Sequence, residues 1–155
     1  MGPIKLGTHI SDYKTEFTGL DSTRVDCYEY KYDGGGPAYE YRYKGRLLFA
    51  LMPAMDSDSI IAIMVIDKDF KMKNGIHPGS TVAQLKEKNG KINIRMDYLT
   101  GGEFMPDSIN GTNYIFDTPD DSLVAAYPDI DKPGIIKRTD VKCNWIEIKS
   151  YNKTQ

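Results

Sequence analysis

The sequence predicts an α+β fold, in which two tandem copies of a short helix plus a four-stranded antiparallel sheet pack as one body. Two observations predict this fold. A glycine-led motif occurs twice, and its glycines, Gly7 and Gly79, are 72 positions apart, which is close to half of the 155 residues. Four strand-like runs follow each occurrence. We therefore assign a first repeat to residues 1–72 and a second to residues 73–155.

The repeated motif has the form I-x-x-G-[ST]-x-[IV]-x-x-[LY]-K. It reads IKLGTHISDYK at 4–14 and IHPGSTVAQLK at 76–86. Its glycine permits the positive φ of a sharp entry turn. A hydroxyl that follows can cap a helix N-terminus, namely Thr8 in the first motif and Ser80 or Thr81 in the second. Thr81 and Gln84 have the spacing of a capping box. Gly90 is expected to end the second helix, and Gly19 the first.

The runs that follow each motif have the apolar content or the alternation of strands. They cover 24–33, 38–44, 46–52 and 59–67 in the first repeat, and 91–99, 103–109, 112–117 and 140–149 in the second. The pairs Lys44-Gly45 and Asn110-Gly111 are typical of tight hairpin turns. The run 59–67 is apolar on both faces, which predicts a central strand, either covered on both sides or lying where the repeats meet.

Six tyrosines alternate with other residues in the first two runs, so period two places them on one face of the predicted sheet. They are Tyr28, Tyr30, Tyr32, Tyr39, Tyr41 and Tyr43. The ordinary interpretation is a core face under the helix, with the hydroxyls at its rim. The alternative is a binding face, since aromatic surfaces concentrate binding energy. These six residues, together with Tyr127, are the candidate binding residues.

The second repeat carries an insertion at about 119–139 that the first lacks. Thr118 can cap a helix, Pro119 suits the first helical position, and two aspartates follow it. These signals predict a short added helix that stops before Pro128, and then an ordered loop. Insertions into a repeated scaffold are frequent places for function, but a decorated loop without a partner is an alternative of at least equal weight.

Charge and motif content exclude several function classes. With 20 basic and 22 acidic residues the net charge is −2, and no basic cluster favours nucleic acid. His9 and His77 lie in different repeats without a metal ligand at the usual spacing. The run DIDKPG at 129–134 lacks the third ligand and the closing glutamate of a calcium loop. We therefore predict no catalytic residue, no metal and no cofactor.

Cysteine content and hydropathy indicate whether a disulfide or a transmembrane segment is expected. Cys27 and Cys143 are interpreted as two buried thiols, with one disulfide as the alternative for a protein outside the cytoplasm. The longest apolar stretch, 60–66, has the length of a strand, so we expect no transmembrane segment.

The second motif resembles a helix element of small bacterial envelope proteins. Gly79, Thr81, Leu85 and Gly90 match the pattern found in the β-lactamase inhibitory protein family and in the small lipoprotein of the outer-membrane β-barrel assembly machinery. The first motif matches only at two positions. The chain is also similar in texture to uncharacterised bacterial lipoproteins. The resemblance implies a periplasmic or outer-membrane-anchored protein without enzymatic activity, whose signal is absent from this chain, and it transfers no binding residues.

The function expected from these observations is a binding or interaction module of the bacterial cell envelope, with another envelope protein as the partner. One alternative is a carrier that holds a small ligand on the tyrosine-lined face. The other is a hydrolase that uses a carboxylate such as Asp56 or Asp121, which would require a deep polar pocket where carboxylates converge. The sequence leaves the oligomeric state open.

Overall fold

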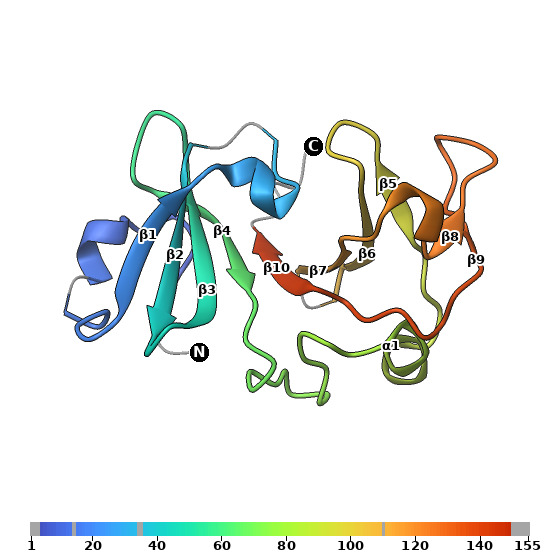
Figure 1. The fold of residues 1–155 in the computed structure, drawn as a ribbon, viewed down its shortest axis with the longest axis horizontal. Helices are drawn as coiled ribbons and strands as arrows, with labels where there is room; N and C mark the ends of the chain where they lie inside the picture. Colours follow the sequence, from blue (N-terminus) through green and yellow to red (C-terminus); the bar gives the residue numbers. More distant parts are fainter. Residues whose placement is uncertain (1–3, 14, 34–35, 110, 150–155) are drawn as a thin grey trace.

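A computed structural model describes residues 4–13, 15–33, 36–109 and 111–149, and its main feature is one eight-stranded antiparallel sheet (Figure 1). The strand order is β1-β2-β3-β4-β10-β7-β6-β5. The strands are β1 (Asp21–Val25), β2 (Ala38–Tyr43), β3 (Arg46–Pro53), β4 (Ile60–Val65), β5 (Arg95–Asp97), β6 (Gly102–Asp107), β7 (Thr112–Phe116) and β10 (Trp145–Lys149). A separate small ribbon pairs β8 (Ala125–Ala126) with β9 (Ile135–Ile136).

The predicted fold class, two copies of a helix plus a four-stranded sheet, is wrong. In the described part of the chain the only α-helix is α1 (Val82–Asn89), and the first motif forms a single 3₁₀ turn, η1 (Ile10–Tyr13). The strands also join into a single sheet, because β4 pairs with β10. If the two groups of strands formed separate sheets, β4 and β10 would be edge strands with unpaired backbone N–H and C=O groups. Pairing β4 with β10 satisfies these groups.

The two motifs differ because only the second has a complete helix start. The Thr81 hydroxyl accepts from the Gln84 amide, and the Gln84 side chain accepts from the Thr81 amide, as a capping box requires. In the first motif the Thr8 hydroxyl donates to the Lys5 carbonyl oxygen instead, at 2.6 Å. Gly19 consequently ends no helix. Lys14, which the motif pairs with Lys86, lies outside the described residues.

Several local predictions are confirmed. Gly7 and Gly79 both have positive φ, and Gly90 caps the C-terminus of α1 by donating to the Lys86 carbonyl. Lys44 and Gly45 both have positive φ in the turn between β2 and β3. Asn110 of the second predicted turn lies outside the described residues. The assignment of repeats to 1–72 and 73–155 stays a prediction.

The predicted central strand is also confirmed. β4 pairs with β3 on one side and with β10 on the other, and five of its six residues are buried. On one side of this junction the sheet continues from β4 through β3 and β2 to β1. On the other side it continues from β10 through β7 and β6 to β5. The β4–β10 contact therefore connects two groups of strands that are distant in sequence.

The sheet carries a buried cluster on each face. The first face packs under η1, α1 and the segment 119–137, and its cluster includes Leu51, Ile63, Val65, Tyr114, Phe116, Ile146, Val82, Leu85 and Val124. The second face packs under the 3₁₀ turn η2 (Cys27–Tyr30), and its cluster includes Ala50, Met52, Ala62, Met64, Ile115 and Trp145. Figure 1 shows η2, in light blue, beside the place where β4 and β10 meet.

The prediction that six tyrosines share one sheet face is wrong. Residues 27–30 form η2 instead of a strand, because the Asp26 side chain caps the turn by accepting from the Tyr28 amide. Tyr30 packs on the second face, whereas Tyr41 packs on the first. Alternate residues share a face only in an extended strand, and the backbone from Tyr28 to Tyr30 is not extended.

The predicted helix in the insertion is also wrong. Only a three-residue 3₁₀ turn, η3 (Asp120–Ser122), forms after Pro119, and no side chain caps it. The Val124 and Ala125 amides donate to the Glu103 carboxylate at 2.7 and 3.0 Å. A helix would need these amides for its own backbone hydrogen bonds, so this contact favours the extended path into β8.

Both cysteines are buried thiols on opposite faces of the sheet. Cys27 belongs to the second-face cluster and Cys143 to the first, so the interpretation as two buried thiols holds. Burial raises the pKa of Cys143 to about 11, so it stays protonated at neutral pH. Within the described ranges, no helix has both the length and the apolar content needed to cross a bilayer.

The N-terminal segment is held against the turn between β3 and β4. The Gly7 amide donates to the Ile60 carbonyl and the Ile60 amide to the Thr8 carbonyl, each at 2.8 Å. Beside them, His9 Nδ1 hydrogen-bonds the Asp58 carboxylate. This contact raises the pKa of His9 and lowers the pKa of Asp58.

The His9–Asp58 pair should make stability depend on pH. The raised pKa of His9 adds stability that is complete below its ordinary value of 6.5 and is lost as the pH rises through the folded value. The lowered pKa of Asp58 adds stability above 3.8 that is lost as the pH falls. Asp58→Asn is therefore expected to lower the melting temperature modestly at about pH 5.5 and less at about pH 8.5. Equal losses at both pH values, or a similar pattern for the control Asp56→Asn, would contradict this assignment.

Candidate functional site

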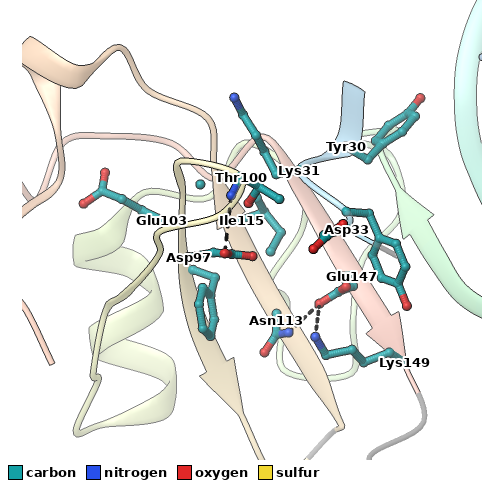
Figure 2. A pocket seen from close by; sticks show the side chains of 13 residues that line it. Tyr30, Lys31, Asp33, Asp97, Thr100, Glu103, Asn113, Ile115, Glu147 and Lys149 are labelled. Atoms are coloured by element: carbon teal, nitrogen blue, oxygen red, sulfur yellow. Dashed lines mark hydrogen bonds and ion pairs between the residues drawn. The ribbon is translucent and has the colours of Figure 1, made fainter. Parts of the chain in front are cut away.

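A cavity of about 220 Å³ lies on the second face of the sheet. Figure 2 shows its arrangement. Strands β7 and β10 form its floor, the segment that follows η2 forms one wall, and the turn between β5 and β6 forms the other. The cavity therefore lies on a part of the second face that η2 does not cover. One of its walls follows β1 in the chain, and the other joins β5 to β6 at the opposite end of the sheet.

The floor carries a buried polar pair. Glu147 on β10 lies directly across from Asn113 on β7, and the two residues are 4% and 2% exposed. The Asn113 amide donates to Glu147 Oε2, and Lys149 Nζ lies 3.2 Å from the same oxygen. Burying a carboxylate and an amide costs free energy unless both are paired, and here the contact between them and the ion pair with Lys149 supply that pairing. The two residues therefore form a fixed polar floor in an otherwise apolar sheet face.

The η2 wall is fixed by Tyr30 and Lys31. The Tyr30 hydroxyl donates to Glu40 Oε1 at 2.7 Å, and its ring meets Trp145 edge-on with the centroids 5.6 Å apart. Burial and Glu40 hold the pKa of Tyr30 well above its usual range, so this hydroxyl stays a neutral donor. Lys31 has a left-handed backbone, with φ of 53°, and turns the chain toward Asp33.

Gly102 lets the two walls approach each other. A Cβ atom built on Gly102 would lie 3.1 Å from both Cβ and Cγ of Lys31, so a larger residue would push the lysine stem away. The Lys31 ammonium extends past Gly102 to Asp117 Oδ1, at 3.3 Å. Tyr28 adds a second link between the walls, because its hydroxyl donates to the Leu99 carbonyl at 3.3 Å.

The β5–β6 wall presents Asp97 and Thr100. Asp97 Oδ1 accepts from the amides of Leu99 and Thr100, at 2.9 and 3.4 Å, which fixes the carboxylate in place. Thr100 is only 7% exposed, and its hydroxyl has no hydrogen-bond partner among the described residues. A buried hydroxyl without a partner costs free energy, and in a cavity wall a bound ligand can supply the missing bond.

Glu103 borders the cavity with its backbone, but Figure 2 shows its side chain pointing away. On the first face its carboxylate accepts four hydrogen bonds, from the Thr118 hydroxyl at 2.9 Å, the Val124 and Ala125 amides, and the Tyr127 hydroxyl at 2.6 Å. Burial and this carboxylate raise the pKa of Tyr127. Glu103 therefore anchors the 119–137 segment and is not a ligand-binding residue.

The seven tyrosines singled out in the sequence are dispersed. Only Tyr30 and Tyr32 line the cavity. The pKa of Tyr32 is raised, mainly by burial and to a lesser extent by the negative charge of Glu147. Tyr39 and Tyr41 border a different hollow on the first face, and Tyr127 binds Glu103. Tyr28 and Tyr43 are each 51% exposed. The motif residues Gly7, Thr8, Gly79, Thr81 and Gly90 are not among the residues that line the cavity.

The residues that define the cavity carry no signal in the sequence that marks them as a site. They are Asp97, Thr100, Asn113, Glu147 and Lys149. Glu147 alternates with apolar residues, a pattern that predicts a solvent-facing position, and its burial becomes visible only once β7 and β10 are paired. Asp56 and Asp121, the carboxylates named for a hydrolase, do not line the cavity.

The comparisons with known proteins concern the fold alone. No family model matches the chain, and no curated protein matches it. Among solved structures the chain is similar to YfeY, an uncharacterised protein from Escherichia coli, with a TM-score of 0.55 and 14% identity. The match covers 84% of this chain and 81% of that chain. At this identity the likeness shows that the two chains share a fold.

Proposed function

We propose that this protein is a non-enzymatic binding module whose ligand occupies the cavity between residues 31–33 and 97–102. The observation that carries the proposal is the combination of the buried Asn113–Glu147 pair with the partnerless Thr100 hydroxyl. A few fixed polar groups in a pocket, one of them a buried hydroxyl without a partner, are a common mark of a site that a ligand completes.

The proposal favours a small ligand over a protein segment. A volume of about 220 Å³ is below that of typical drug-sized sites. The expected small-ligand carrier is thus retained in modified form, with Tyr30 and Tyr32 as its aromatic contacts instead of all six strand tyrosines. We keep the bacterial cell envelope as the proposed location, on the resemblance of the Gly79–Gly90 element. Fractionation of the cells that produce the protein tests that location.

Ligand-induced stabilisation tests the proposed function. We expect at least one compound in a library of small charged and neutral metabolites to raise the melting temperature by several degrees, since a ligand that binds only the native state stabilises it. Asp33→Trp places a large ring at the exposed cavity wall and should abolish the shift. Asp56→Trp, on the exposed turn between β3 and β4, is the matched control and should retain it.

Two results would reject the proposal. One is the absence of any compound whose effect is lost in Asp33→Trp and kept in Asp56→Trp. The other is turnover in a broad hydrolase screen that disappears in Asp97→Asn, because this would make the cavity a catalytic site. Asparagine at position 97 retains an oxygen that accepts from the Leu99 and Thr100 amides, so this variant should fold.

A further inference from the structure

We infer that the ligand of this cavity is a small organic cation with a primary ammonium group. The inference rests on the proposed function, because it names the ligand class of the same site. Three features of the cavity carry it: an excess of negative charge, a hydrogen-bond acceptor that lacks a partner, and an apolar surface beside both.

The excess of negative charge comes from two carboxylates. Figure 2 shows Asp33 and Asp97 pointing toward the cavity from opposite walls. The two lysines at the site are already paired, Lys31 with Asp117 and Lys149 with Glu147. In the described ranges neither Asp33 nor Asp97 has an ion-pair partner. A cation between them would therefore meet uncompensated negative charge in a partly desolvated space, where electrostatic attraction is stronger than in water.

The free hydrogen-bond acceptors of this site match the donors of an ammonium group. An ammonium has three N–H donors, and a carboxylate has about four lone-pair sites. Asp97 Oδ1 uses its acceptor capacity on two backbone amides, which leaves the other oxygen of the carboxylate for a ligand. The Thr100 hydroxyl, which lacks a partner in the described part of the chain, supplies an acceptor close by. Asp33 supplies a third acceptor from the opposite wall.

An organic cation fits better than a metal ion. Ile115 on the floor and the rings of Tyr32 and Phe104 offer apolar contact to a short carbon chain, and an aromatic face attracts an ammonium group. Hard metal ions instead require six or more oxygen ligands at short range. No group of three or more His, Cys, Asp or Glu side chains in the described ranges is arranged to hold a metal ion.

Calorimetric titration with putrescine tests the inference. Its neutral diol analogue has nearly the same shape without charge, and free lysine tests whether an amino acid can supply the ammonium group. We expect putrescine or lysine to bind the wild-type protein and the diol not to bind. Asp97→Asn should weaken binding about tenfold or more, because a charge-assisted hydrogen bond is lost. Thr100→Val should weaken it several-fold, and the control Asp56→Asn should leave it unchanged.

The outcomes separate the two proposals. Binding of putrescine or of lysine that is weakened in Asp97→Asn and kept in Asp56→Asn supports the ammonium assignment, and the compound that binds identifies the source. Equal binding to both variants would overturn it as non-specific attraction. If an anionic or neutral compound gives an Asp33→Trp-sensitive shift while neither amine binds, the ammonium assignment fails and the binding function stands. If no compound of any class binds, both fail.

Discussion

Replacing Glu103 with Ala is expected to lower the free energy of unfolding by about 3–4 kcal/mol. The Glu103 side chain is fully buried and accepts four hydrogen bonds, one from Thr118 and three from the 119–137 segment, which fix this segment to β6. Alanine would leave the buried amides of Val124 and Ala125 without an acceptor, and an unsatisfied buried amide costs more than the hydrogen bond itself contributes. Urea denaturation at neutral pH measures the loss.

Two further variants make the Glu103 prediction specific. Glu87→Ala removes an exposed carboxylate from α1 and should change stability by no more than about 0.5 kcal/mol. Glu103→Gln keeps one acceptor oxygen but turns an amide toward the other donors, so its effect should be intermediate. A loss in Glu103→Ala as small as that in Glu87→Ala would show that the carboxylate does not hold the segment.

Replacing Ile146 with Ala should cost about 2–5 kcal/mol, because the side chain is fully buried and a cavity would remain. Ile146 lies at the junction of the sheet, opposite Val65 on β4 and Tyr114 on β7. Trp145, the single tryptophan, lies next to it and reports on the junction by fluorescence. We expect one unfolding transition, at a lower urea concentration, by both fluorescence and far-UV circular dichroism.

The control for the junction is Ile130→Ala, since Ile130 is 72% exposed on the loop between β8 and β9. This variant should unfold within about 0.5 kcal/mol of the wild type. Two separated transitions in Ile146→Ala, with the fluorescence change preceding the loss of strand signal, would mean that one group of strands stays folded without the other. The continuous sheet would then not act as one cooperative unit.

Local signals in the sequence were sufficient where the hydrogen bonds involved are local. The capping box joins Thr81 to Gln84, three residues apart, and the turn at Lys44-Gly45 depends on backbone angles at two neighbouring positions. The apolar run that became β4 is legible because a strand buried on both faces has no polar side. Each of these features is encoded within a few residues.

The prediction of two similar halves went too far because it treated a shared pattern as a shared structure. His9 stands where the second motif has Thr81, and without a complete helix start the first motif forms only a 3₁₀ turn. The alternation of Tyr28, Tyr30 and Tyr32 suggested a strand, but Asp26 closes a turn there. In the first motif the absence of an N-cap side-chain hydrogen bond among the described residues decided the local structure against the periodicity, and at Asp26 the presence of one did so.

The sequence by itself determined most strands of the antiparallel sheet, although not β1, and also the α1 boundaries and the near balance of charge, because these depend on composition and on contacts within a few residues. The tertiary structure alone decided that one sheet forms and that a polar cavity lies on it. Pairing of β10 with β4 and β7 buries Glu147 beside Asn113, and the approach of Lys31 to Gly102 closes the site. Contacts between residues so far apart in the chain have no local signal, since they depend on how every intervening element packs.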